Sequence, residues 1–244
     1  MPDNRFYLPQ NLEIGSICLI KEMELHHLQH VMRVKEKETI ELINGKGQLA
    51  TGIVQKLERH QASVLIETVI SETVKGPTLI LAQAMPRIAR LEYIVEKATE
   101  LGVTEIWLFP STHSEKKEYS PSNIQRLNQI LVASLKQSGR LFIPEIVYKK
   151  NLRQWTPLSI PAFFGDTAPD APNFLKVIEK QENTTALWMV GPEQGFTGQE
   201  SDFIKASLSI TGVSLNPNIL RVDTAAITGL AILFLSLNKT INKQ

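Results

Sequence analysis

The 244 residues suffice for one large domain or two ordinary ones, and the 43% hydrophobic content is typical of a globular protein and argues against a disordered chain. The 26 basic and 25 acidic residues give a net charge of +1, so nucleic-acid binding would need a local basic patch. The single cysteine, Cys18, excludes an internal disulfide, and residues 1–10 lack the pattern of a signal peptide, so we expect a cytoplasmic protein.

Short runs that alternate between apolar and polar residues occupy residues 16–70. An Asn44-Gly45 pair, followed closely by Gly47, indicates a tight turn between two of them. This pattern predicts a small antiparallel sheet or barrel. A short helix is expected to interrupt it at residues 24–34, where the residues on one side are Leu25, Leu28, Val31 and Met32.

After a polar joint at about residues 72–77, the pattern changes to strands that alternate with helices. We therefore expect a domain boundary near residue 72 and, beyond it, an α/β domain with a mostly parallel sheet covered on both faces. The expected strands are residues 79–85, 103–109, 161–166, 186–191 and 213–215.

Helix start and stop signals complete this second region. A helix at residues 88–101 should stop at Gly102, and another should run from Ser120-Pro121 to Gly139. Thr197 and Glu200 form a capping box for a helix to about Leu208, and the last helix should begin near Asp223. The longest apolar run, Ala225 to Leu237, is interrupted and shorter than the ~18–20 residues of a membrane span, so no membrane contact is expected.

Three of the expected strands end in corners built from small or turn-forming residues: Phe164-Gly165-Asp166, Val190-Gly191-Pro192-Glu193 and Leu215-Asn216-Pro217-Asn218. Ligands of open α/β sheets lie beyond the carboxyl ends of strands, so these corners predict a shared pocket. None matches a dinucleotide fingerprint or a phosphate loop. Ordinary turn chemistry remains the alternative interpretation of each corner.

His26 and His30 lie four residues apart on one expected helix, which is a possible zinc spacing. No group of Cys, Asp or Glu completes a ligand set beside them, so we expect no metal site. A polar helix face is the simpler interpretation.

Several motifs occur together in one order: Glu96 to Val103 (EKATELGV), Gln137 to Arg140 (QSGR), Gly191 to Phe196 (GPEQGF), Asn218 to Ala226 (NILRVDTAA) and the segment of residues 27–47. In this order the chain resembles the ribosomal RNA small subunit methyltransferase E family of the SPOUT class. It departs from the usual family pattern at Gln194, where a second glycine is usual, at Val222-Asp223, where Thr-Glu is usual, and at Lys136, where Glu is usual.

The resemblance implies a PUA-like RNA-binding β-barrel domain at residues 1–72 and a SPOUT domain with a C-terminal trefoil knot at residues 73–244. It also implies a homodimer that binds S-adenosylmethionine at the three corners. The cofactor-binding residues implied are Phe164, Gly165, Val190, Gly191, Pro192, Gly195, Leu215, Asn216, Ile219, Leu220 and Ala225.

The activity implied is methylation of N3 of a uridine in 16S ribosomal RNA of the small subunit. Glu193 or Asp223 is the candidate base, and Arg140 and Arg221 are candidates for contacts to an anion or a phosphate. The candidate RNA-binding residues are Arg5, Arg33, Arg87, Arg90 and Lys97; the alternative for each is a solvated surface charge. The rival function is a non-catalytic RNA-binding ribosome-assembly factor whose cofactor site is degenerate.

Overall fold

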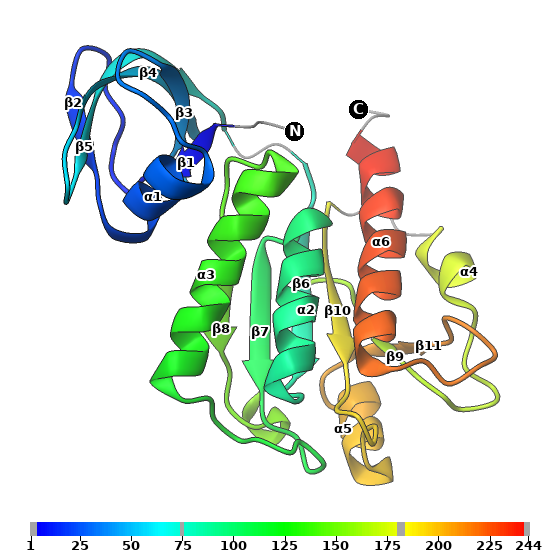
Figure 1. Cartoon of the computed structure of the whole chain (residues 1–244). Coiled ribbons are helices and arrows are strands. Elements are labelled where there is room, and N and C mark those ends of the chain that lie inside the picture. Colours follow the sequence, from blue (N-terminus) through cyan, green and yellow to red (C-terminus); the bar gives the residue numbers. More distant parts are fainter. Residues whose placement is uncertain (1–3, 74–75, 180–183, 242–244) are drawn as a thin grey trace. The chain divides into compact units, whose positions relative to one another are not determined.

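A computed structural model describes residues 4–73, 76–179 and 184–241, and it divides the chain into two compact units (Figure 1). The first unit contains Met1–Lys75 and Val132–Ile143, and the second contains Gly76–Leu131 and Pro144–Gln244. This division differs from the expected boundary near residue 72 chiefly because residues 132–143 belong to the first unit. Sequence patterns report local structure, whereas this assignment depends on contacts between distant segments.

The first unit is built on a curled five-stranded sheet with the order β1-β3-β4-β5-β2. Most neighbours are antiparallel, as predicted, but β1 pairs in parallel with β3. The Asn44 side chain stabilises the β3–β4 turn by accepting hydrogen bonds from the backbone of Lys46 and Gln48 at 2.8 and 3.1 Å. The strands are Arg5–Tyr7 (β1), Ile17–Ile20 (β2), Thr39–Ile43 (β3), Gln48–Leu57 (β4) and Ala62–Ser71 (β5).

The helix of this unit is shorter than expected and changes its hydrogen-bond pattern. α1 (Glu22–His26) continues into a π-helical turn, η1 (His27–Val31), in which the amide of Met32 bonds to the carbonyl of His27 at 2.9 Å. The wider turn rotates later side chains relative to a regular helix. Val31, which the pattern places on one side with Leu25 and Leu28, is 59% exposed, whereas the two leucines are buried.

Residues 132–143 join the first unit through the β3–β4 turn. The amide of Gly47 donates to the carbonyl of Leu141 at 2.9 Å, and the amide of Ile143 donates to the carbonyl of Gly45 at 3.0 Å. Leu135 and Leu141 are buried in one cluster with Ile43 of β3. These contacts fix the end of the long helix α3 (Pro121–Ser138) to the small sheet.

The second unit contains a six-stranded, wholly parallel sheet with the order β11-β9-β10-β6-β7-β8, which confirms the predicted α/β class. The last strand lies two residues earlier than expected, and β8, a strand of four residues, had no prediction. The trefoil knot implied by the family resemblance stays a prediction. The strands are Thr78–Ala84 (β6), Glu105–Phe109 (β7), Glu145–Tyr148 (β8), Ala162–Gly165 (β9), Thr185–Val190 (β10) and Thr211–Val213 (β11).

Two long helices of this unit, α2 (Ile88–Glu100) and α6 (Val222–Ile241), contact each other, and α6 also contacts β6 and β10 (Figure 1). Gly229 permits the close approach of α6 to the sheet, because a Cβ there would lie 2.0 Å from Cε2 of Trp188. Another hydrophobic core cluster of this unit includes Phe109 of β7, Phe164 of β9 and Ile204 of α5 (Gly198–Ala206). The remaining short elements are η2 (Leu152–Gln154) and α4 (Phe174–Ile178).

The predicted boundaries of α2, α3 and α5 agree closely with the structure. The left-handed conformation of Gly102, with φ of +89°, follows the end of α2, and Gly139, with φ of +79°, follows α3. Both interactions of the predicted capping box between Thr197 and Glu200 are present at the start of α5. These helices therefore begin and end where local side-chain chemistry requires it.

Helix α6 extends beyond the apolar run of residues 225–237 at both ends. An 18-residue window, Val222–Lys239, has a mean hydropathy of 1.3 and meets the length and composition of a membrane span, so the expectation that this segment is too short is wrong. About a third of the window, 33%, is buried, and Leu233 and Leu237 belong to the core. A core helix of a globular protein satisfies the same criterion.

Candidate cofactor cavity at the carboxyl ends of three strands

A cavity of about 590 Å³ lies where the adjacent strands β11, β9 and β10 end. Its walls are the three loops that follow these strands, together with the first turn of α6. The prediction that the three corners share a pocket is therefore confirmed. The cavity lining includes every residue that the resemblance implied for cofactor binding: Phe164, Gly165, Val190, Gly191, Pro192, Gly195, Leu215, Asn216, Ile219, Leu220 and Ala225.

Gly191 and Gly195, the two glycines of the middle corner, are favoured by two different structural constraints. Gly195 has a φ of +74°, a left-handed conformation that side chains with a Cβ rarely adopt. A Cβ added to Gly191 would lie 3.3 Å from the ring of Phe196, which is tighter than ordinary packing. The backbone conformation thus favours glycine at position 195, and the narrow space beside Phe196 favours glycine at position 191.

Hydrogen bonds fix the corner from both sides. The side chain of Gln83, which is fully buried at the end of β6, donates from Nε2 to the carbonyls of Ala84 at 2.8 Å and Gly191 at 3.3 Å. Nδ1 of His113 lies 3.1 Å from the carbonyl of Gly195. The sequence prediction missed Gln83, although a glutamine inside an apolar strand run was an available signal.

Glu193 lines the cavity, but its carboxylate also has a structural partner. Oε1 accepts a hydrogen bond of 3.0 Å from the backbone amide of Arg87, the residue that precedes α2. This bond satisfies a backbone donor at a helix start and complements the positive end of the helix dipole. The side chain of Arg87 forms an ion pair with Glu115, so its charge is compensated within the unit.

Asp223 and Arg90, predicted separately as a base and an RNA contact, form an ion pair with each other. Oδ1 of Asp223 lies 2.9 Å from Nη1 of Arg90, and the side chains are 22% and 32% exposed. The pair joins the first turn of α6 to α2. Arg221, just before α6, is exposed, and its neighbours Leu220 and Val222 line the cavity.

Arg140 belongs to the first unit, whereas the cavity belongs to the second. Burial of the Arg140 guanidinium lowers its pKa, although the group stays charged near neutral pH. Its role in contacts to an anion stays a prediction.

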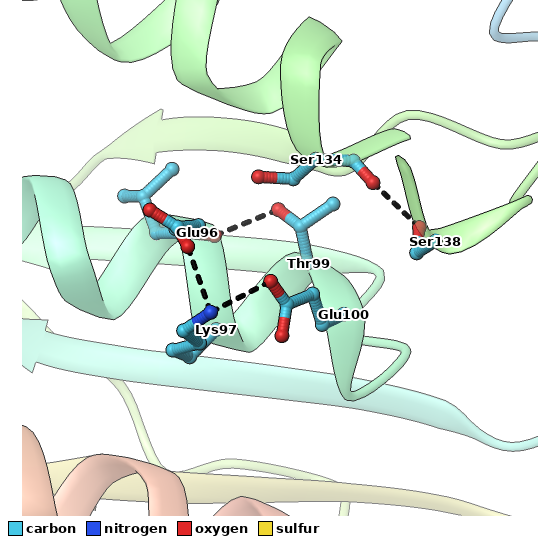
Figure 2. Close-up of polar contacts among 7 residues, drawn as sticks. Glu96, Lys97, Thr99, Glu100, Ser134 and Ser138 are labelled. Carbon is cyan, nitrogen blue, oxygen red and sulfur yellow. Dashed lines mark hydrogen bonds and ion pairs between the residues drawn. The ribbon is translucent and has the colours of Figure 1, made fainter. Parts of the chain in front are cut away.

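Two other candidate RNA contacts have carboxylate partners. Arg5 lies 2.8 Å from Glu41, and its side chain is only 9% exposed. Figure 2 shows Lys97 between Glu96 and Glu100, at 2.7 and 2.8 Å. A hydrogen bond to Glu100 and a second one to Glu96 raise the pKa of Lys97. The positive charge of Lys97 is therefore stabilised within α2.

Arg33 is exposed, and its φ of +53° places it in the left-handed region after η1. Of the candidate RNA contacts on the first unit, Arg33 thus offers its side chain to solvent, whereas Arg5 is buried beside Glu41.

The described residues contain no group of three His, Cys, Asp or Glu side chains that could hold a metal ion. His26 and His30 approach each other, with ring centroids 4.8 Å apart, on the segment of α1 and η1. Their contact is a ring–ring contact at the surface of the first unit.

Comparisons with known proteins agree with this architecture. A family model described as an RNA methyltransferase domain matches residues 74–234, and one described as an RNA methyltransferase PUA domain matches residues 20–67. Curated relatives named ribosomal RNA small subunit methyltransferase E include a Rickettsia conorii protein, 26% identical over 95% of each chain, and a Bacillus subtilis protein, 24% identical over 91% of each chain.

A solved structure extends the similarity to three dimensions. The ribosomal RNA small subunit methyltransferase E of Neisseria gonorrhoeae, bound to S-adenosyl methionine, has a TM-score of 0.83 and 27% identity, covering 93% of this chain and 95% of its own. The similarity thus spans both units and nearly the full length of each relative. The chain belongs to the RNA methyltransferase family that includes the ribosomal RNA small subunit methyltransferase E proteins.

Proposed function

We propose that this protein transfers a methyl group from S-adenosylmethionine to N3 of a uridine in 16S RNA of the small ribosomal subunit. The observation that carries the proposal is the cavity at the ends of β11, β9 and β10, lined by all eleven residues expected to bind the cofactor. The solved Neisseria gonorrhoeae relative, which binds S-adenosyl methionine, supports the choice of cofactor.

The residues of the cavity fit this cofactor. A volume of about 590 Å³ falls in the range of ~300–1,000 Å³ typical of small-molecule sites. Phe164, Val190 and Leu220 provide apolar wall, while Gly191 and Asn216 provide backbone and amide groups for polar atoms. The bound cofactor supplies a methyl group on a sulfonium with a neutral leaving group, so the chain needs no nucleophilic side chain of its own.

The protein must deal with the proton on N3 of uracil. Each of the candidate carboxylates, Glu193 and Asp223, uses one oxygen in the contacts described above, and its second oxygen has no hydrogen-bond partner among the described residues. The second oxygen of one of these two carboxylates, Glu193 or Asp223, accepts the proton. Arg221 and Arg140 stabilise the uracil anion or a neighbouring phosphate.

We assign the protein to the cytoplasm, where it works as a homodimer on ribosomal RNA or the small subunit. Apolar side chains on the two contacting helices support the dimer, since Leu235 of α6 is 63% exposed and Tyr93 of α2 is 47% exposed. A second copy that covers these side chains removes apolar surface from water. Light scattering should give twice the chain mass of 27.4 kDa.

Calorimetry with S-adenosylmethionine tests the function. Binding in a one-to-one ratio per chain supports the enzyme, provided that transfer of labelled methyl to small subunits follows. The rival, a non-catalytic assembly factor, predicts RNA binding without cofactor binding. Gln194 and the Val222-Asp223 pair are the departures that would favour this rival.

A further inference from the structure

A second, smaller cavity lies at the opposite edge of the six-stranded sheet, beside the edge strand β8. Its volume is about 290 Å³, near the lower limit of small-molecule sites, which is ~300 Å³. None of its residues lines the cavity already described. The lining residues are Trp107, Tyr148, Lys149, Lys150, Gln154, Trp155, Thr156 and Leu158.

Two indole rings form the fixed part of this aromatic pocket. Trp107 and Trp155 meet edge to face, with centroids 5.7 Å apart and planes at 75°. The ring nitrogen of Trp107 donates to Oε2 of Glu105 at 2.7 Å, and that of Trp155 donates to the carbonyl of Lys150 at 2.8 Å. Because both N–H groups are satisfied inside the protein, the rings are held in place and can offer only their faces to a ligand.

The charge of the pocket is positive. Lys149 and Lys150 line it without any acidic residue. Within residues 4–73, 76–179 and 184–241, neither ammonium has a carboxylate partner at ion-pair distance, in contrast to Lys97 and Arg87. Positive charge without a carboxylate partner, beside two partly exposed aromatic rings, complements a phosphate joined to a planar base.

Lys149 occupies the place that such a base would take. Its Nζ lies 3.9 Å from the centroid of Trp107 and 5.8 Å from that of Trp155. An exposed cation–π contact changes an equilibrium constant roughly two- to fivefold. A base stacked on an aromatic ring contributes roughly five- to 150-fold. A base can therefore displace the ammonium, which then becomes available to a phosphate.

We propose that this aromatic pocket binds one unpaired nucleotide of the RNA substrate, with its base on the indole rings and its phosphate at Lys149 and Lys150. The choice of RNA as the partner rests on the proposed function. The pocket is an RNA-docking site separate from the cofactor cavity, and it favours single-stranded over double-stranded RNA because a paired base cannot leave its stack without cost.

Tryptophan fluorescence reports directly on this site. The chain has three tryptophans, and the third, Trp188, is fully buried against Phe174. We would titrate the full-length protein with a single-stranded oligouridylate of twelve nucleotides and with a duplex RNA of equal length. Quenching that saturates with the single strand but is at least fivefold weaker with the duplex is expected. No quenching, or equal quenching by both, would overturn the proposal.

Charge variants supply the second measurement. Lys149→Gln combined with Lys150→Gln should weaken single-strand binding about tenfold and flatten its salt dependence by about 0.7 units of log–log slope, for the one phosphate that both lysines contact. Trp107→Phe, which keeps a ring in the partly buried position, should weaken binding by less. Lys176→Gln, at an exposed lysine of α4, is the matched control and should change neither quantity. An unchanged affinity in the double variant would refute the pocket.

The two proposals fail separately. Methyl transfer and S-adenosylmethionine binding by the wild type without fluorescence quenching would leave the proposed function intact and remove the pocket. Quenching by RNA without methyl transfer would do the reverse.

Discussion

The cavities near the two edges of the six-stranded sheet are lined by different kinds of residue. At β11, β9 and β10, glycine, proline and asparagine follow the strands and leave a large cavity of about 590 Å³. At β8, tryptophan and lysine leave about 290 Å³ with positive charge. Small residues leave the backbone accessible and the cavity wide, whereas large aromatic side chains form a flat surface on which a ring can stack. The larger cavity has room for the proposed cofactor, and the smaller one has flat aromatic surface for the proposed single base.

The largest expected effect concerns proton removal at the cofactor cavity. Glu193→Gln keeps an oxygen that can accept from the amide of Arg87, so folding should be unchanged. Single-turnover methyl transfer should fall more than about a hundredfold, on the order of 3 kcal/mol, with loss of the low-pH limb of its rate profile. Asp223→Asn, measured under cofactor saturation, tests the alternative base.

If both carboxylate variants keep the wild-type pH profile, Glu193 and Asp223 are excluded as the base. Stabilisation of the uracil anion by Arg221 or Arg140 would then be the mechanism to test. A loss of rate in Asp223→Asn alone would assign the base to the carboxylate that pairs with Arg90.

The next effect tests whether the cofactor cavity depends on the absence of side chains. Gly191→Val should weaken S-adenosylmethionine binding roughly five- to 150-fold in calorimetry, because an added Cβ already lies 3.3 Å from Phe196 and overpacking costs about 1–3 kcal/mol. Gly198→Val is the control, since nothing lies within 4 Å of a Cβ at that position. Equal affinities in the two variants would place the cofactor elsewhere.

A smaller effect separates charge that serves RNA from residues that serve the cofactor. Arg140→Ala should leave S-adenosylmethionine affinity nearly intact, lower RNA affinity a few-fold and flatten the salt dependence by about one unit of log–log slope. Filter binding at several salt concentrations measures the slope, with Lys176→Ala as the control. A slope equal to that of the wild type would assign Arg140 to structure alone.

The smallest effect concerns Glu200, which fixes the loop after Gly195. Burial would raise the pKa of Glu200, but the hydrogen bonds from Thr197 and Thr112 outweigh it and lower the pKa. A lowered folded-state pKa stabilises the protein above the unfolded value of about 4.3, and this stability is lost as the pH falls through the folded-state pKa. Glu200→Gln should therefore cost about 1 kcal/mol at pH 7.

Urea denaturation of the Glu200→Gln variant at pH 7 and at lower pH gives the measurement. The difference in unfolding free energy between wild type and variant should shrink as the pH decreases from about 5 to 3. Glu118→Gln, at an exposed glutamate, should show no such trend. A constant difference across this range would contradict the assigned hydrogen bonds.

The sequence was informative where local chemistry decides the structure. The capping residues Thr197 and Glu200 and the stop at Gly102 mark helix ends within a few residues, and the three glycine and proline corners predicted the cofactor cavity. The family resemblance supplied the individual residues of that cavity, because turn chemistry alone does not distinguish a ligand corner from an ordinary one.

Features that depend on distant segments were not predictable in this way. The attachment of residues 132–143 to the first unit requires the hydrogen bonds between Leu141 and Gly47, far apart in the sequence. Likewise, the aromatic pocket joins Trp107 of β7 to Trp155 beyond β8. Neither tryptophan has a local signal of function, since Trp107 is a single aromatic residue in a strand, which is typical of cores, and Trp155 is a single aromatic residue that follows the short helix η2.

The most direct test of the central claim is nucleoside mass spectrometry of 16S ribosomal RNA from a strain that lacks this protein. The account predicts that 3-methyluridine disappears in that strain, returns fully when the wild-type chain is expressed and returns only in part with Gly191→Val. An unchanged amount of 3-methyluridine after deletion would contradict the proposed reaction, and full restoration by Gly191→Val would contradict the proposed cofactor cavity.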